Sequence, residues 1–109
     1  MKKEMIVYSI SDSLGGTSQK LLSAVTAQYP DIIFNKSYRF PFINKEDELL
    51  DILRDAIKDD ALVISTLVDG KLSSVAREFS LMHGLSYLDL MHPFFEIIKE
   101  KTGRDPIEV

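Results

Sequence analysis

Four short apolar runs alternate with four amphipathic segments along the chain. Three of the runs are rich in β-branched or aromatic residues, as buried strands are, and the run over 32–40 alternates more, as an edge strand does. The intervening segments carry apolar residues at helical spacing. We therefore predict strands over Met5–Ser11, Ile32–Phe40, Ala61–Thr66 and Ser86–Leu90, and helices over Ser18–Tyr29, Lys45–Lys58, Lys71–His83 and Phe94–Lys101.

The strict alternation of strands and helices predicts the fold class. Short connections between them favour right-handed crossovers, and hence a parallel sheet that is covered by helices. We expect a three-layer α/β fold, Rossmann-like or flavodoxin-like, with four strands in the order 2-1-3-4. Residues 1–101 form one domain in this interpretation, and 102–109, where the periodicity stops at Gly103, begin a linker.

Capping residues support these boundaries. Asn44 is expected to cap the second helix, Gly84 to end the third, and Pro93 to lie at the start of the fourth. For the first helix, Ser13 and Thr17 are both candidate caps.

Composition and charge exclude several classes of function. The net charge of −4 argues against general binding of nucleic acid, which requires a basic surface. The absence of cysteine excludes disulfides and thiol chemistry, and two histidines without ligand spacing predict no metal site. No apolar run is long enough for a membrane span or a signal peptide, so we expect a cytoplasmic protein.

The carboxyl ends of the predicted strands carry the candidate chemistry, because ligands of open parallel sheets bind there. The first loop is the strongest candidate, since two glycines, hydroxyls and the start of a helix favour the binding of an anion such as phosphate. The alternative is an ordinary strand-to-helix turn. The candidate residues are Ser11, Asp12, Ser13, Gly15, Gly16 and Thr17 after the first strand, Arg39 after the second, Thr66 and Asp69 after the third, and Asp89 and His92 after the fourth.

The later candidates each have a structural alternative. Arg39 can clamp an anion or lie on the surface over the Phe-Pro-Phe corner. Asp69 can bind a ligand or cap the helix that follows it, and capping alone would justify an aspartate. Asp89 and His92 can form a local loop contact.

One enzyme hypothesis follows from two short motifs. Ser11-Asp12-Ser13-Leu14 resembles the G-D-S-L signature of a family of serine esterases, and Asp89-x-x-His92 resembles their D-x-x-H pair. Ser13 would be the nucleophile, His92 the base and Asp89 its orienting partner. The first glycine of the signature is missing, and no G-x-N-D segment completes an oxyanion hole.

A broader resemblance covers the whole chain. The segments Ile10–Thr17, Arg39–Phe42, Thr66–Asp69 and Asp89–Pro93 lie in order at four successive predicted strand ends. This arrangement resembles the N-terminal half of the pyruvate, phosphate dikinase regulatory proteins, also called phosphoenolpyruvate synthetase regulatory proteins. Gly16 departs from the family pattern, which usually has glutamate there, and so does Ser18, where a small apolar residue is commoner.

The resemblance implies a bifunctional serine/threonine kinase and phosphorylase. Such proteins use ADP to phosphorylate a threonine of pyruvate, phosphate dikinase or phosphoenolpyruvate synthetase, and use inorganic phosphate to remove the phosphoryl group as pyrophosphate. Their nucleotide-binding P-loop lies in a C-terminal domain, and no G-x-x-x-x-G-K-[ST] motif occurs in this sequence. The resemblance therefore implies an N-terminal domain that is not catalytic by itself, needs no cofactor, and precedes a P-loop domain that binds ADP or ATP.

Two alternatives remain open at this point. The chain can be a separate anion-binding module or a module that interacts with another protein. Phe94 and Phe95 fit a homodimer interface as well as they fit a core.

Overall fold

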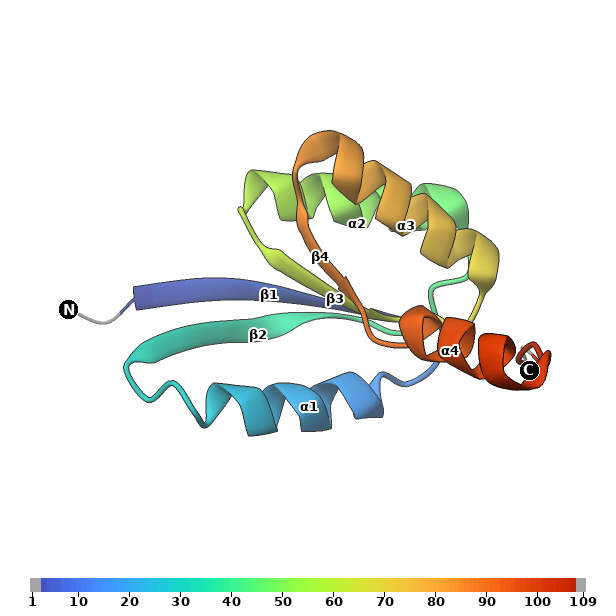
Figure 1. The fold of residues 1–109 in the computed structure, drawn as a ribbon. Coiled ribbons are helices and arrows are strands. Elements are labelled where there is room, and N and C mark those ends of the chain that lie inside the picture. The colour runs from blue at the N-terminus through green and yellow to red at the C-terminus, as the bar shows by residue number, and fades with distance from the viewer. Residues whose placement is uncertain (1–2, 108–109) are drawn as a thin grey trace.

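Strands and helices alternate along the chain in the predicted order. The computed structural model describes residues 3–107. Figure 1 shows the strands β1 (Lys3–Ser11), β2 (Ile32–Phe40), β3 (Leu62–Thr66) and β4 (Ser86–Asp89), and the helices α1 (Gly16–Thr26), α2 (Glu46–Lys58), α3 (Gly70–His83) and α4 (His92–Thr102).

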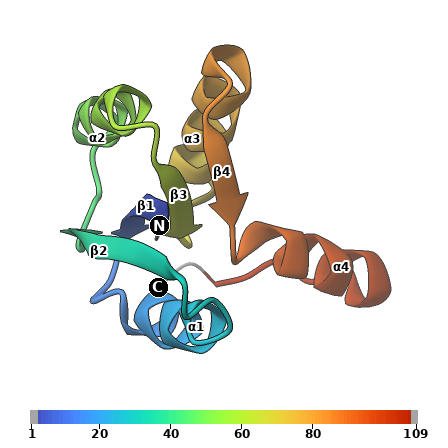
Figure 2. The same cartoon turned by 90° about the vertical axis from the view of Figure 1, so that its left-hand side faces the viewer.

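The four strands form one parallel sheet in the order β2-β1-β3-β4. Helix α1 lies on one face of this sheet, and α2 and α3 lie on the other (Figures 1 and 2). The prediction of a three-layer, Rossmann-like α/β fold with strand order 2-1-3-4 is confirmed. All four strands point the same way, so the loops that follow them meet at one edge of the sheet.

The core is larger on the face that α2 and α3 cover. On that face Leu49 and Leu53 of α2 pack with Ile10 and Val63 of the sheet, and all four side chains are fully buried. The face under α1 has a much smaller buried cluster, made of Val7, Leu22 and Ile64.

Strand β2 contains a bulge that reverses which way its side chains face. Between Ile6 and Tyr8 of β1 the partner residue on β2 advances from Asn35 to Tyr38, so β2 has one extra residue there. Before the bulge, Phe34 packs into the cluster under α1. After the bulge, Tyr38 stacks on Tyr8 with ring centroids 4.7 Å apart, on the α2 side. The alternation of apolar and polar residues in β2 is unbroken, but because of the bulge its apolar residues pack into the cores on both faces of the sheet.

Two capping predictions are confirmed. Gly84 follows α3 with φ 64°, a left-handed conformation that glycine adopts without strain. Pro93 lies in the first turn of α4.

Other capping predictions are wrong. The residue before α2 is Lys45, in an extended conformation and without a side-chain hydrogen bond, so Asn44 is not the cap. Helix α1 starts after Gly15 rather than after Ser13 or Thr17. Gly15 has φ 82°, which lets the chain turn into the helix two residues earlier than predicted.

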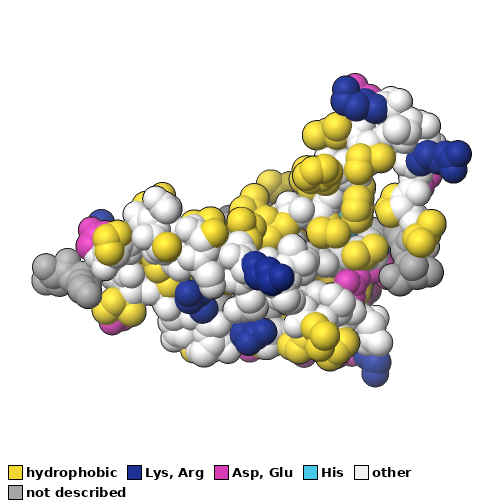
Figure 3. Space-filling view, turned by 90° about the horizontal axis from the view of Figure 1, so that it is seen from below, with side chains coloured by type: hydrophobic (Ala, Val, Ile, Leu, Met, Phe, Trp, Pro, Cys, Tyr) yellow, Lys and Arg dark blue, Asp and Glu magenta, His cyan; other side chains and the backbone are white. Residues whose placement is uncertain are grey.

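Helix α4 projects from the rest of the molecule. It continues from the end of β4 and none of its residues is buried, which Figure 2 shows as a helix standing clear of the sheet. In the space-filling view, hydrophobic side chains gather beside this projection and along it (Figure 3).

Candidate functional site

The loop from β1 to α1 holds together the carboxyl edge of the sheet. The carboxylate of Asp12 accepts hydrogen bonds from the backbone N–H groups of Val68 (2.8 Å) and Asp69 (3.0 Å) in the β3–α3 loop. Because one oxygen serves both donors, Asp12 acts as a clasp between two loops that are more than fifty residues apart in sequence.

The same loop binds the connection from β2 to α2. The carbonyl oxygen of Ser11 accepts from the N–H of Ile43 (2.9 Å), and that of Ser13 accepts from the N–H of Phe42 (3.0 Å). Phe42 has φ 57° and is exposed. A left-handed conformation is uncommon for a bulky residue, so these hydrogen bonds hold the backbone in a strained turn beside the candidate site.

The start of α1 is fixed by buried serines. Ser18 donates a hydrogen bond to the carbonyl oxygen of Gly15 (2.9 Å), and its hydroxyl lies 2.7 Å from that of Ser9. Gly15, before α1, makes no side-chain cap, and the N–H groups of the first turn, at Gly16, Thr17 and Ser18, have no side-chain acceptor within residues 3–107. These groups and the positive end of the helix dipole point toward the carboxyl edge of the sheet.

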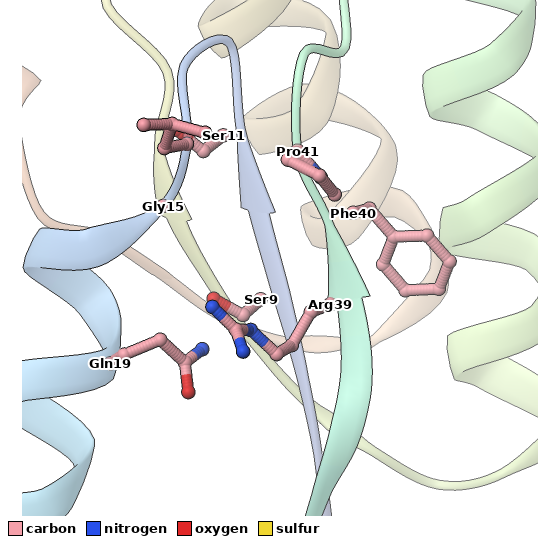
Figure 4. Close-up of a pocket in the computed structure, with 8 residues that line it drawn as sticks. Ser9, Ser11, Gly15, Gln19, Arg39, Phe40 and Pro41 are labelled. Atoms are coloured by element: carbon pink, nitrogen blue, oxygen red, sulfur yellow. The ribbon is translucent and has the colours of Figure 1, made fainter.

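A small hollow lies between this helix start and β2. Figure 4 shows the side chains of Arg39 from β2, Gln19 from α1 and Ser9 from β1 pointing toward one another across it. Its volume is about 10 Å³, close to the minimum that one water molecule requires. An anion the size of phosphate would therefore bind at the open rim of the hollow.

Arg39 is the cationic group at this rim. It is exposed, and it forms no ion pair with any residue between 3 and 107. The bulge in β2 explains its orientation: Arg39 pairs with Ser9 in the sheet and lies on the α1 face. Without the extra residue it would lie on the opposite face.

Thr66 lies on the other side of β1 from Arg39. It pairs with Ser11 in the sheet and is 6% exposed, and its hydroxyl has no hydrogen-bond partner in the described part of the chain. Of the first loop, Ser11 is buried, with its hydroxyl 3.2 Å from that of Ser13, whereas Ser13 and Thr17 are exposed.

Three other predicted site residues have structural contacts. Asp69 caps α3 by accepting from the N–H groups of Lys71 (2.9 Å) and Leu72 (3.0 Å), as the alternative interpretation required. Asp89 accepts from the Ser73 hydroxyl (2.6 Å) and from two N–H groups that start α4. The Nε2 atom of His92 lies 2.9 Å from the carbonyl oxygen of Leu67.

These contacts give no support to the serine hydrolase hypothesis. The Asp89 carboxylate binds the backbone of His92 and not its ring, and the ring has a carbonyl partner. The hydroxyl of Ser13 is paired with Ser11. Within residues 3–107, no hydrogen bond links Ser13, His92 and Asp89 as a triad requires.

The part of the chain that the structure describes has neither a metal-binding cluster nor a membrane-spanning helix. Residues 3–107 contain no group of three or more acidic or histidine side chains placed to hold a metal ion. No helix in this range has the length and apolar character that a membrane span needs.

Sequence reasoning missed Gln19, Ser9 and Ser18. Ser18 was noted only as a departure from a family pattern, although a serine three residues after a turn glycine can bond back to it. Ser9 and Ser11 are two residues apart on β1, so they face the same side of the sheet. This spacing could have identified Ser9 from the sequence. Gln19 had none, because helix faces cannot be assigned until the first residue of the helix is known.

Comparisons with known proteins identify a family. The family model described as Kinase/pyrophosphorylase matches residues 7–109. Proteins named as pyruvate, phosphate dikinase regulatory proteins are 94% identical to this chain over 109 residues in Streptococcus gordonii, 87% over 109 in Streptococcus sanguinis and 65% over 108 in Enterococcus faecalis. The matches cover 99–100% of this chain but 40% of each relative, so the chain spans less than half of their length.

Proposed function

Because the chain belongs to the kinase/pyrophosphorylase family, we propose that it is the N-terminal domain of a regulatory protein that acts on pyruvate, phosphate dikinase. Three relatives at 65–94% identity carry that dikinase in their names, and this supports the choice of partner. The proposed activity is the transfer of phosphate from ADP to a threonine of the dikinase, and its removal by inorganic phosphate as pyrophosphate.

The proposal assigns the nucleotide chemistry to the part of the protein outside this chain. The sequence contains no G-x-x-x-x-G-K-[ST] loop, which would cradle nucleotide phosphates through its backbone and its lysine. ADP or ATP would therefore bind in a C-terminal domain beyond 102–109. The expected setting is the cytoplasm, where the target would be phosphorylated.

Within this domain, we assign an anion-binding role to the rim between α1 and β2. The observation that carries this assignment is the guanidinium of Arg39, which has no ion-pair partner among residues 3–107. The β2 bulge holds it on the same face as the uncapped first turn of α1. Serine and threonine hydroxyls at Ser13 and Thr17 add donors at the same edge. A phosphate group carried by a substrate or by the target protein is the chemistry that such donors recognise.

A thermal titration with phosphate, pyrophosphate, ADP and pyruvate tests the anion site. A ligand present at about ten times its dissociation constant adds about 1.4 kcal/mol to the free energy of unfolding. That gain raises the melting temperature of a domain of this size by roughly 5–10 °C. Stabilisation by phosphate or pyrophosphate, and little by uncharged controls, is the expected result.

Two variants place the binding on the structure. Arg39→Ala and Ser13→Ala should each reduce the stabilisation by phosphate, because each removes a proposed donor to the anion. Both side chains are exposed, so their loss leaves the core intact. Arg54→Ala is the matched control, because Arg54 is an exposed arginine on α2 that pairs with Asp51 of the same helix. Equal stabilisation in Arg39→Ala and Arg54→Ala would remove Arg39 from the site.

The regulatory activity is tested separately with a full-length relative. The Streptococcus gordonii protein is mixed with pyruvate, phosphate dikinase and ADP, and threonine phosphorylation is followed by mass spectrometry. Phosphorylation with ADP and its phosphate-dependent reversal with release of pyrophosphate are expected. A dikinase that stays unmodified under both conditions would contradict the proposed activity while leaving the anion site intact.

A further inference from the structure

We propose that an apolar surface on β4 and α4 is covered, in full-length members of the family, by the part of their polypeptide that this chain does not match. The surface, called here the β4–α4 surface, consists of Leu88 of β4 and Phe94, Ile97 and Ile98 of α4. The inference depends on family membership and not on the activity proposed above.

The sequence of α4 presents one apolar stripe. Ile97 and Ile98 lie three and four residues after Phe94, which places all three side chains on one face of the helix. They are 69%, 54% and 43% exposed. A helix of eleven residues is marginally stable in water unless such a face packs against something.

The hydrogen bonds that join α4 to the body of the domain, among the described residues, lie at the beginning of the helix. Asp89 accepts hydrogen bonds from the N–H groups of Met91 and His92, and the His92 ring reaches the Leu67 carbonyl. Farther along, the contact between Arg77 and Glu96 is 3.9 Å long and exposed, so it contributes little. The apolar stripe therefore starts in the anchored turn, at Phe94, and continues along a projecting helix (Figure 2).

The sheet adds to the same surface. Leu88 pairs with Ile64 and lies on the α1 face of the sheet. Ile64 is buried beneath α1, but Leu88 is 52% exposed because α1 does not reach β4. Parallel sheets normally have both faces covered. Figure 3 shows hydrophobic side chains both on the body of the molecule and on the projection.

The length of the relatives indicates which polypeptide covers the β4–α4 surface. About 60% of each relative has no counterpart in this chain, because the match covers 40% of it. The polypeptide after α4 also lies against this helix: Lys99 pairs with Asp105 at 3.0 Å, and Phe95, Ile98 and Pro106 line a common hollow of about 170 Å³. Chain that continues from there starts beside the β4–α4 surface.

Covalent connection favours the unmatched part of the same polypeptide over a second molecule of the chain. A segment joined by a short connection has an effective concentration near millimolar, whereas a second molecule must be supplied from solution. Interfaces between domains of one chain commonly bury enough surface to cover such a patch.

Hydrogen exchange tests the proposal directly. The amides of 92–102 are compared in this chain and in the full-length Streptococcus gordonii relative, which is 94% identical over 109 residues. We expect exchange to be at least about tenfold slower in the full-length protein, since covering a helix raises the free energy of its local opening. Equal exchange in the two proteins would overturn the proposal. Protection in the short chain that rises with its concentration would also overturn it, in favour of a second copy.

A pair of variants makes the test specific. Ile97→Asp, at the matching position of the full-length relative, should lower its melting temperature by several degrees more than in the short chain. Leu81→Asp is the control, because Leu81 is a 78% exposed apolar residue on α3, away from the surface. Equal effects of Ile97→Asp in the short and full-length proteins would contradict the proposal even if both variants fold.

Discussion

Tyr8 is a buried tyrosine whose hydroxyl donates to the carboxylate of Asp59. Burial, with Asp59 adding to it, raises the pKa of this hydroxyl well above its ordinary value. Above about pH 10 the unfolded chain ionises this tyrosine while the folded chain keeps it neutral. The stability that Tyr8 contributes is therefore present below pH 10 and is lost as the pH rises further.

We predict that Tyr8→Phe flattens the alkaline part of the stability profile. The free energy of unfolding, measured with urea from pH 8 to pH 11, should fall less steeply in the variant than in the parent chain. At neutral pH the variant should lose about 1.5–3 kcal/mol, the usual contribution of one hydrogen bond to a charged group. Parallel profiles in parent and variant would contradict this assignment.

The Asp12 clasp supports a second prediction. Asp12→Ala leaves two backbone N–H groups without their acceptor, and should lower the free energy of unfolding by about 1–3 kcal/mol. Asp12→Asn keeps one oxygen that can accept from the same groups, so its loss should be smaller. Urea unfolding of the two variants checks this. Equal losses of unfolding free energy would show that Asp12 stabilises the fold through its charge and not through its acceptor oxygen.

For single residues, the sequence predicted where the candidate side chains lie better than it predicted what they do. Nearly every candidate residue lies at the carboxyl edge of the sheet, as strand-end reasoning required. Asp12, Asp69 and Asp89, however, accept hydrogen bonds from nearby backbone or serine groups. A carboxylate at a strand end serves a helix start and a ligand equally well, so only the geometry separates the two uses.

Among the elements, α1 is preceded by Gly15 and begins at Gly16, and these two glycines have different backbone conformations. Gly15 adopts φ 82°, whereas Gly16 is helical and a Cβ built on it meets nothing within 4 Å. An alanine at Gly15 would be forced into a left-handed conformation, and an alanine at Gly16 would not. A glutamate, the residue usual in the family, would also have room at Gly16.

Opposite effects on stability are therefore expected from two matched substitutions. Gly15→Ala should destabilise the chain by about 1–2 kcal/mol through backbone strain. Gly16→Ala should stabilise it by about 0.4–1 kcal/mol, because it lowers the entropy of the unfolded chain and suits a helix. Thermal and urea unfolding of the pair measure both, and a loss of stability in Gly16→Ala would refute this account.

The existence, type and order of all eight elements could be predicted from the sequence, whereas their ends could not be fixed as well. Helices α1 and α4 both begin two residues before the predicted position, since Gly15 and Asp89 provide starts that hydrophobic periodicity does not reveal. The bulge in β2 is also invisible in the sequence, because the alternation through Phe34 and Tyr38 continues without a break.

Across the whole molecule, stability depends unequally on the two faces of the sheet. Leu53 is fully buried in the large cluster under α2 and α3, while Leu22 is 7% exposed in the small cluster under α1. Leu53→Ala should cost about 3–5 kcal/mol, in the upper part of the range for buried leucines, and Leu22→Ala about 2–3 kcal/mol. Urea unfolding of both variants measures the difference, and Leu21→Ala, at a half-exposed neighbour of Leu22, provides the control.

The strand order and the three layers followed from alternation and crossover rules, which act on the whole chain at once. The sequence could not show how far α1 reaches across its face. That extent depends on the angle at which α1 crosses the strands. Because α1 stops short of β4, one face of β4 stays uncovered.

The bulge in β2 has a consequence for self-association. Strand β2 is an outer strand, and its free N–H and C=O groups could pair with the outer strand of another molecule and seed aggregates. The extra residue between Asn35 and Tyr38 breaks the regular spacing of those groups, and the cationic side chain of Lys36 lies at the break. Lys36→Val would remove the charge while keeping the bulge and both cores, and this variant should form thioflavin-positive fibrils under conditions in which the parent chain stays dispersed.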